Sequence, residues 1–314
     1  MKTKCKPTVC GGCNSLVGAV LLIAMSAQAQ NLFVTDFHSG EITEITPGGV
    51  QSTFASGLGR PAGLAFNSAG NLFLADYARI IYEFTPDGMQ STFAIGFDGP
   101  IALAFNSAGY LFEADAAGGN IYKFAPDGTK TTFASGLDAP YGLVFNNAGD
   151  LFEADLSSGN IYEFTPGGAQ STFAAGLVDP IGLAFNSAGD LFEADAGSGN
   201  IYEFTPGGTE TTFASGLILP YGLAFNSAGD LFVASYGNGT VYEFTPDGAK
   251  STFALVWLSR GASPSSPCLN PRFLDCWALG PQHSSLAALH YCHASLKLAN
   301  RELFGSPHAF LLVN

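Results

Sequence analysis

The stretch FNSAGDLFEADAGSGNIYEFTPGG, residues 185–208, decides the fold because close copies of it recur along the chain. Its central segment, DLFEAD at 190–195, returns as NLFVTD, NLFLAD, YLFEAD, DLFEAD and DLFVAS, starting at residues 31, 71, 110, 150 and 230. Successive copies are thus separated by 39 or 40 residues. A fixed period of this size is typical of solenoids and propellers.

Each copy predicts four short strands separated by turns. GLAF, DLFEAD, IYEF and STFA are rich in aromatic and β-branched residues, which favour strands. The segments between them, such as NSAG, SGN and TPGG, carry the residues that tight turns require, so neighbouring strands should pair antiparallel. Four antiparallel strands per repeat, arranged radially, make a β-propeller. The sequence therefore predicts an all-β, six-bladed β-propeller of four-stranded antiparallel blades over residues 30–254.

One blade is expected to lack its inner strand. Five complete blades begin at prolines, but residues 31–56 supply only the second, third and fourth strands of another; the prolines are Pro61, Pro100, Pro140, Pro180 and Pro220. The repeat stops after Ala254, and the non-repeat tail 255–314 has the composition of a different sequence, as a reading-frame change would produce. We hypothesise that Ala309–Val313 supplies the closing strand, and the leucine spacing predicts a short helix over 284–303.

The first 29 residues have the pattern of a signal peptide. A start rich in lysine precedes a short apolar run, and Ala27-Gln28-Ala29 is a small-residue cleavage site. We therefore expect a secreted or extracytoplasmic protein, and a monomer. No other stretch is apolar enough over the roughly 18 residues that a membrane span needs.

The charge of the repeat region excludes several partners. Residues 30–254 hold almost all of the 26 acidic residues but only five of the 12 basic ones. A chain this acidic repels nucleic acid and anionic membranes, which require clustered cations.

The pattern P-x-G-L-A-F-N-x-x-G-x-L-F-x-A-D…G-N-I-Y-E-F-T-P-x-G resembles NHL repeats, which are related to the gluconolactonase-like and streptogramin lyase-like propellers. The resemblance covers residues 31–254 and implies the propeller fold. In gluconolactonase-like enzymes, Asn or Asp after the blade-starting proline helps to hold the catalytic metal; here those positions are Ala62, Ile101, Tyr141, Ile181 and Tyr221. The lyases use a channel histidine, and the repeat region has only His38. Because these groups are not matched, we expect no enzyme activity, with a divergent enzyme as the alternative.

The repeated carboxylates allow two interpretations. The aspartates that end the second strands either accept backbone N–H bonds in the following turn or form a ring that holds Ca²⁺, with Asp115, Asp155 and Asp195 as its ligands. We expect no resident cofactor otherwise. Three further carboxylates, Glu113, Glu153 and Glu193, stand where other copies have aliphatic residues. They indicate either a wet strand face or a patch that binds a cation or a basic ligand.

Tyr141, Ile181 and Tyr221 are expected at the mouth of the channel, where they either pack or bind a ligand. The leading interpretation is an exported, non-enzymatic scaffold that binds a protein, peptide, sugar or small molecule at one end of the ring. The alternatives are a divergent metal-dependent lactonase, hydrolase or lyase of the gluconolactonase-like superfamily, and a structural cell-surface or matrix repeat protein.

Overall fold

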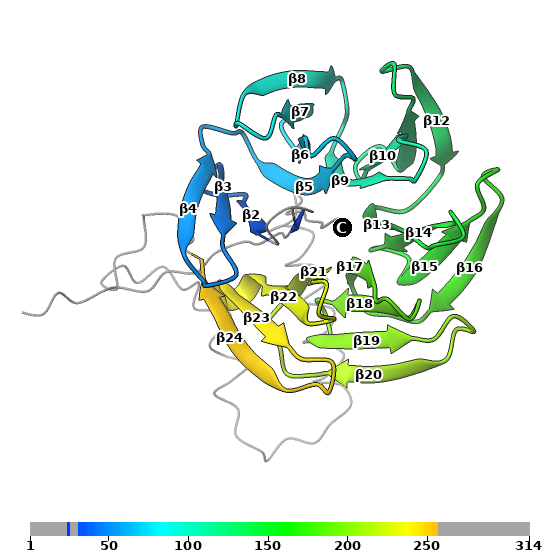
Figure 1. Cartoon of the computed structure of the whole chain (residues 1–314). Helices are drawn as coiled ribbons and strands as arrows, with labels where there is room; N and C mark the ends of the chain where they lie inside the picture. Colours follow the sequence, from blue (N-terminus) through cyan, green and yellow to red (C-terminus); the bar gives the residue numbers. More distant parts are fainter. Residues whose placement is uncertain (1–23, 26–30, 257–314) are drawn as a thin grey trace, which may run out of the picture.

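The computed structural model describes residues 24–25 and 31–256, which form six sheets arranged around a central axis (Figure 1). Within each sheet the four strands follow one another in sequence order and pair antiparallel. The first strand of each blade lies at the hub and the fourth at the circumference. The predicted all-β, six-bladed propeller is therefore confirmed. Within the described residues, no helix is long and apolar enough to cross a membrane.

The blade boundaries agree with the repeat. Blade 1 consists of β1 (Ala24–Met25), β2 (Leu32–Asp36), β3 (Glu41–Ile45) and β4 (Gln51–Ala55). Blade 2 consists of β5 (Pro61–Phe66), β6 (Leu72–Asp76), β7 (Ile80–Phe84) and β8 (Gln90–Ile95). Blade 3 consists of β9 (Pro100–Phe105), β10 (Leu111–Asp115), β11 (Asn120–Phe124) and β12 (Lys130–Ser135). Blade 4 consists of β13 (Pro140–Phe145), β14 (Leu151–Asp155), β15 (Asn160–Phe164) and β16 (Gln170–Ala175). Blade 5 consists of β17 (Pro180–Phe185), β18 (Leu191–Asp195), β19 (Asn200–Phe204) and β20 (Glu210–Ala214). Blade 6 consists of β21 (Pro220–Phe225), β22 (Leu231–Ser235), the short 3-10 helix η1 (Tyr236–Asn238), β23 (Thr240–Phe244) and β24 (Lys250–Leu255).

The inner strand of blade 1 differs from the other five. β1 has two residues, with Ala24 opposite Phe33 and Met25 opposite Leu32, whereas the other inner strands have six residues each. β1 lies inside the predicted signal peptide, so cleavage after Ala29, if it occurs as the sequence predicts, would remove this strand. The expected closing strand at 309–313 and the expected helix at 284–303 lie outside the described residues.

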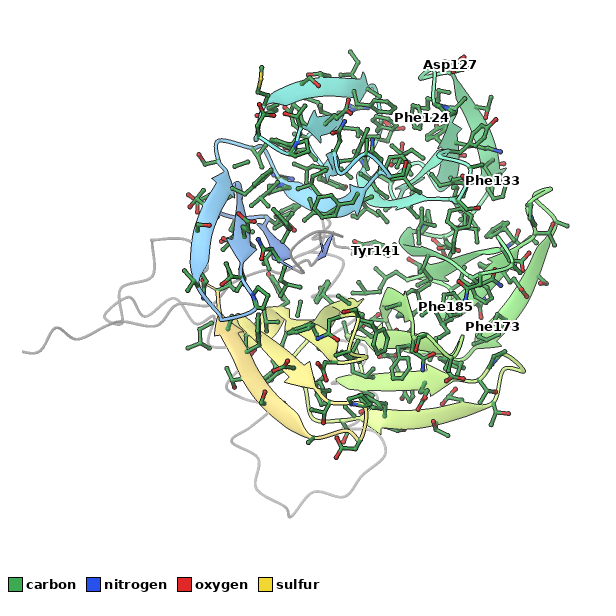
Figure 2. The ribbon with its side chains drawn as sticks, viewed as in Figure 1. Phe124, Asp127, Phe133, Tyr141, Phe173 and Phe185 are labelled. Atoms are coloured by element: carbon green, nitrogen blue, oxygen red, sulfur yellow. The ribbon has the colours of Figure 1, made fainter. Side chains whose placement is uncertain are left out.

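Phenylalanine triads join neighbouring blades. In the triad between blades 5 and 6, the Phe192 ring meets those of Phe213 and Phe225 edge to face, with centroids 5.1 and 5.0 Å apart. Equivalent triads lie at the four preceding junctions, with centroid distances of 5.0 to 5.3 Å. Figure 2 labels Phe173 and Phe185 of the triad between blades 4 and 5. The core is thus a series of apolar layers between blades, each supplied by the same repeat positions.

The inner strands approach one another closely at the hub. A Cβ on Gly182 would lie 1.9 Å from the carbonyl oxygen of Tyr221 in the next blade, and one on Gly142 would lie 2.3 Å from that of Ile181. Glycine is required there because any side chain would collide with the neighbouring backbone. A bulge displaces the residue between Pro and Gly in these strands, as at Ile181.

The ring closes by side-to-side packing of blades 6 and 1. The Gln51 side chain of β4 donates from Nε2 to the Leu255 carbonyl of β24 at 3.0 Å, and these outer strands are adjacent in Figure 1. Val34 and Ile45 of blade 1 belong to the same buried cluster as Phe232 and Val256.

The two ends of the ring carry different turns. The aspartate end holds the turns that follow the second strands and the loops that lead from one blade into the next. The asparagine end holds the turns between the first and second strands, such as 186–189, and those between the third and fourth strands, such as 205–208.

Candidate functional site

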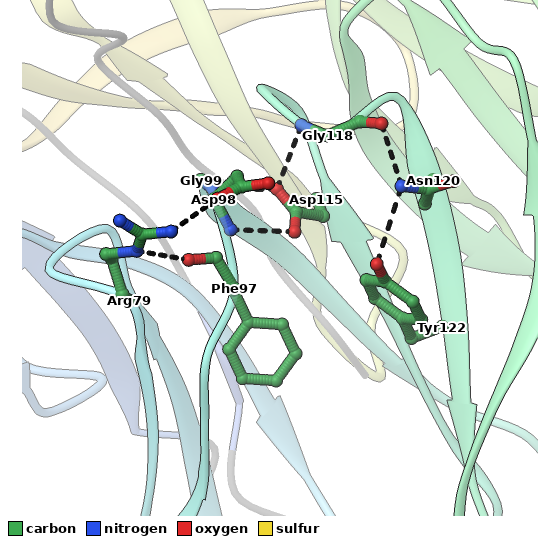
Figure 3. Close-up of polar contacts among 8 residues, drawn as sticks. All are labelled: Arg79, Phe97, Asp98, Gly99, Asp115, Gly118, Asn120 and Tyr122. Carbon is green, nitrogen blue, oxygen red and sulfur yellow. Dashed lines mark hydrogen bonds and ion pairs between the residues drawn. The ribbon is translucent and has the colours of Figure 1, made fainter.

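The aspartates that end the second strands fix the backbone of the aspartate end. In blade 3 the Asp115 carboxylate accepts N–H bonds from Gly118 in its own turn, at 3.1 Å, and from Asp98 and Gly99, at 2.9 and 2.6 Å (Figure 3). The last two residues precede the inner strand of the same blade. Arg79 of blade 2 adds an ion pair to Asp98. Asp115 therefore links its own turn to the loop that precedes β9, 16 or 17 residues earlier in the chain.

The same arrangement recurs in the neighbouring blades. Asp76 accepts bonds from three backbone N–H groups, and Asp155 and Asp195 accept one from the preceding loop and one from their own turn. In blade 6, Ser235 replaces the aspartate and donates from Oγ to the Ile218 carbonyl at 2.7 Å. Asp36 in blade 1 accepts only from His38 and Ser39, and its buried Oδ2 has no hydrogen-bond partner in the described structure.

The aspartates do not fit a calcium site. Their oxygens face backbone N–H donors, and a cation needs several oxygens that converge on one point without such donors. No group of three or more potential metal-ligating side chains forms within the described ranges. The geometry thus favours the turn-binding interpretation of Asp115, Asp155 and Asp195.

The three repeat-breaking glutamates are buried. Glu113, Glu153 and Glu193 are each 0% exposed, so the expectation of a wet strand face is wrong. Their second-strand positions face the preceding blade, where Leu74 and Val233 pack in other copies. None of their six carboxyl oxygens has a hydrogen-bond partner among the described residues. The carboxyls therefore occupy apolar interfaces and do not form a surface patch.

Burial favours the protonated form of these carboxyls. It raises the pKa of Glu113, Glu153 and Glu193 well above the usual value, and the aspartate two residues further along each strand raises it again. Lys130 lowers the pKa of Glu113 by a smaller amount. The backbone amide of Ile181 also lowers the pKa of Glu193 by a smaller amount, although the contact does not meet hydrogen-bond geometry. A neutral carboxyl is the form that a low-dielectric interface tolerates.

The hub residues expected at the channel mouth are also buried. Tyr141 is 3% exposed, and Tyr221 and Ile181 are each 2% exposed. Burial raises the pKa of both tyrosine hydroxyls. Tyr141 lies close to the axis in Figure 2. This position favours packing at the hub, and a direct binding role for these residues stays a prediction.

An aromatic arc crosses three consecutive blades at the aspartate end. We use this name for Tyr77 of blade 2, Phe37 and His38 of blade 1, and Tyr236 and Tyr221 of blade 6. Successive ring centroids along it lie 6.2, 5.8, 6.5 and 5.2 Å apart. His38 is exposed and the rings of Tyr77 and Tyr236 are half-buried. Phe37 and Tyr221 are buried, so the arc exposes parts of His38, Tyr77 and Tyr236 at the aspartate end.

Arg60 adds a cation to the arc. Its exposed guanidinium lies 5.6 Å from the Phe37 ring centroid, and its backbone N–H is held by Asp76 at 2.8 Å. Burial raises the pKa of Tyr77, whereas the Arg60 charge lowers it. In the opposite half of the ring, the positions equivalent to Phe37, Tyr77 and Tyr236 are Ala116, Leu156 and Ala196, whereas the equivalent of Tyr221 in blade 4 is Tyr141. Among the described residues, aromatic rings directly after the second strands, with a cation beside them, therefore occur in one half of the ring.

Sequence reasoning did not identify Phe37, Tyr77, Tyr236 or Arg60 as candidates. A signal was present, because the residue after each second-strand aspartate or serine is aromatic in three copies and small or aliphatic in the other three. In the sequence the aromatic copies are the first, second and sixth copies. They become neighbours because the ring closes between blades 6 and 1.

No family model and no curated protein matches the chain. Solved structures do. A virginiamycin B lyase from Staphylococcus aureus matches with a TM-score of 0.61 and 16% identity, covering 78% of this chain and 85% of the lyase. A gluconolactonase from Xanthomonas campestris matches with a TM-score of 0.64 and 17% identity over 70% and 84% of the two chains. A chain of a nidogen–laminin complex matches with a TM-score of 0.62 and 20% identity over 73% and 89%.

At these identities the similarity shows the fold alone. The neighbours include two enzyme classes and a protein complex, so they do not choose between catalysis and binding. The chain has the six-bladed propeller fold that streptogramin B lyases and gluconolactonases share.

Proposed function

We propose that the chain is an exported, non-enzymatic scaffold that binds a partner across the aspartate end, over the aromatic arc. The observation that carries this proposal is the divergence of the repeats. Strands and turns are nearly the same in all six copies, whereas Phe37, Tyr77 and Tyr236 differ from the equivalent residues of the other three blades and lie in consecutive blades. Selection on folding alone would act equally on every copy.

The chemistry of the arc defines the partner that fits. Half-buried tyrosine rings provide apolar contact with a polar hydroxyl, as interface tyrosines do. Arg60 provides a planar donor group for a carboxylate. We therefore expect a protein or peptide segment that places an apolar side chain against Tyr77 and Tyr236 and an acidic group beside Arg60.

Capture from the extracytoplasmic fraction tests this function. The immobilised wild-type propeller should retain a specific partner, and the double variant Arg60→Glu/Tyr77→Ala should retain it about tenfold more weakly. Met89→Ser is the matched control, because Met89 is 69% exposed in the turn before β8, at the asparagine end. Equal retention by the double variant and the control would exclude the arc as the binding surface.

A divergent enzyme is the second candidate, and one observation favours it. His38, the only histidine of the repeat region, lies within the arc, and a catalytically inactive histidine-to-alanine variant of the Staphylococcus lyase has been solved with quinupristin. Lactone hydrolysis and streptogramin opening should be assayed with Zn²⁺, Ca²⁺ or Mn²⁺ added. Turnover that is lost in His38→Ala or Asp155→Ala, with the fold intact, would favour this candidate over the scaffold.

A structural role at the cell surface or in a matrix is the third candidate. The similarity to a chain of a nidogen–laminin complex is compatible with it but rests on the fold. A structural repeat protein would assemble without the arc, so Arg60→Glu/Tyr77→Ala would leave its incorporation unchanged.

A further inference from the structure

The asparagine end has grooves between neighbouring blades. The groove between blades 5 and 6 has a volume of ≈ 490 Å³. The Phe192, Phe213 and Phe225 triad lines its base, and the turn 245–248 of blade 6 forms one wall. Phe213 and Phe225 are half-buried, so parts of their rings remain accessible. The base is therefore an aromatic surface inside a concave site.

Oxygen acceptors surround this aromatic base. Glu203, Asp247 and Asn186 line the groove, and none of the described lining residues is a lysine or arginine. Burial, followed by the negative charge of Asp190, raises the pKa of Glu203. The Asn186 side chain donates from Nδ2 to the Asp190 carboxylate at 3.0 Å, and this bond fixes the orientation of both side chains at the edge of the groove. The groove thus combines apolar ring surface with carboxylate acceptors.

The groove between blades 3 and 4 provides an internal comparison. It has the same triad, but Lys123 replaces the equivalent of Glu203, Tyr110 that of Asp190, and Gly167 that of Asp247. The Lys123 ammonium lies 4.3 Å from the Tyr110 ring centroid and 5.5 Å from that of Phe112. The volume there is ≈ 250 Å³. Lys123 therefore places a cation beside Tyr110 and Phe112, where the groove between blades 5 and 6 has the Glu203 carboxyl.

We propose that the groove between blades 5 and 6 binds a neutral carbohydrate. A pyranose ring has an apolar C–H face that can lie on phenylalanine and hydroxyl groups that donate to Glu203 and Asp247. An anionic ligand would be repelled by these carboxylates. A purely apolar ligand would bury their oxygens without hydrogen bonds, which is costly.

The repeat supplies the same residues at two other junctions. A phenylalanine triad, a third-strand glutamate and a turn aspartate occur between blades 1 and 2, with Glu44 and Asp87, and between blades 2 and 3, with Glu83 and Asp127. Between blades 4 and 5, Glu163 is present but Gly207 takes the place of Asp247. Several junctions with these residues would let the ring bind a polysaccharide at more than one point. This site lies at the opposite end from the aromatic arc, so it does not depend on the arc having a partner.

Two reciprocal substitutions test the proposal. Calorimetric titration with maltose, cellobiose and lactose should detect binding of at least one sugar by the wild-type protein, and none of glucuronate. Glu203→Lys places at this junction the cation that lines the smaller groove between blades 3 and 4. It should lower the number of sites by about one, or weaken that site about tenfold through lost stacking and hydrogen bonds. The double variant Lys123→Glu/Gly167→Asp, which supplies the two carboxylates that the groove between blades 3 and 4 lacks, should add a site.

Circular dichroism checks that each variant folds, and Glu203→Gln offers a second change without added bulk, with an expected weakening of about threefold. The proposal is overturned if none of the three disaccharides binds, if glucuronate binds as tightly as the best of them, or if Glu203→Lys and Lys123→Glu/Gly167→Asp both leave the number and the affinity of the sites unchanged.

Discussion

The two halves of the ring differ at the same repeat positions. Blades 3, 4 and 5 have a buried glutamate in the second strand and a small or aliphatic residue after the strand; these pairs are Glu113 and Ala116, Glu153 and Leu156, and Glu193 and Ala196. Blades 6, 1 and 2 have an aliphatic residue and an aromatic ring instead; these pairs are Val233 and Tyr236, Val34 and Phe37, and Leu74 and Tyr77. Both changes follow the same division into consecutive blades.

The two halves of the ring use the same repeat in different ways. The glutamate half places polar groups in its interfaces, at a cost in stability, whereas the aromatic half keeps apolar interfaces and carries the binding surface that we propose. The strands, turns and phenylalanine triads are nearly the same in both halves. The repeat therefore determines the ring, and the positions that vary determine what each half does.

The largest expected effect comes from removing an aspartate that joins two loops. Asp115→Ala leaves three N–H groups without their acceptor, so we expect unfolding to become easier by about 3–5 kcal/mol. Ser235→Ala in blade 6 removes one bond and should cost about 1 kcal/mol. Urea denaturation measures both. Equal losses would mean that the carboxylate does not join the loops in solution.

The interface glutamates provide the next test. Glu153→Leu replaces a buried carboxyl without hydrogen-bond partners by the type of residue found at Leu74, and should stabilise the protein by about 1–3 kcal/mol at pH 7. The reverse change, Leu74→Glu, should destabilise it by a similar amount. If Glu153→Leu is instead destabilising, a buried partner satisfies that carboxyl in solution.

The same glutamates predict an unusual dependence on pH. Their pKa values are raised in the folded state, so the folded protein retains protons that the unfolded chain releases. Their contribution is fully present below the usual glutamate pKa of about 4.3 and is lost as pH rises towards the folded-state values, by at most about 1.4 kcal/mol per pH unit for each carboxyl.

The triple variant Glu113→Gln/Glu153→Gln/Glu193→Gln isolates this contribution from the other carboxylates. Its stability relative to the wild type should increase with pH across this window. The nearby charged groups, Asp115, Lys130, Asp155, Asp195 and Glu210, are unchanged in the variant and cancel in the difference. A difference that does not vary with pH would show that the three carboxyls titrate normally.

The smallest expected effect on stability is at the aromatic arc. Arg60→Ala removes an exposed cation over the Phe37 ring and should cost about 0.5 kcal/mol, as exposed cation–π pairs do. Thermal unfolding should therefore change little while partner binding falls. A large loss of stability would identify Arg60 as a structural residue.

Much of the fold could be predicted from the sequence because each repeat contains its own strand and turn signals. Asp115 could also be placed in its turn with Gly118. Its bonds to Asp98 and Gly99 could not, because they depend on how the loop from the preceding blade returns to the hub.

The candidate site was harder to predict, because exposure depends on neighbouring blades. Glu113 and Tyr141 have polar groups that suggested contact with solvent, yet both are buried where blades meet. His38 and Tyr236 are almost 200 residues apart, and they come together only when blade 6 packs against blade 1.

The most direct test of the division into two halves is site-specific photo-crosslinking in the cell that produces the protein. Ala78 and Ser157 are exposed residues at equivalent places in blades 2 and 4, next to Tyr77 and Leu156. A photoreactive amino acid at position 78 should form an adduct with a partner, and one at position 157 should not. Equal adducts from both positions, or an adduct from position 157 alone, would contradict the assignment of binding to the aromatic half.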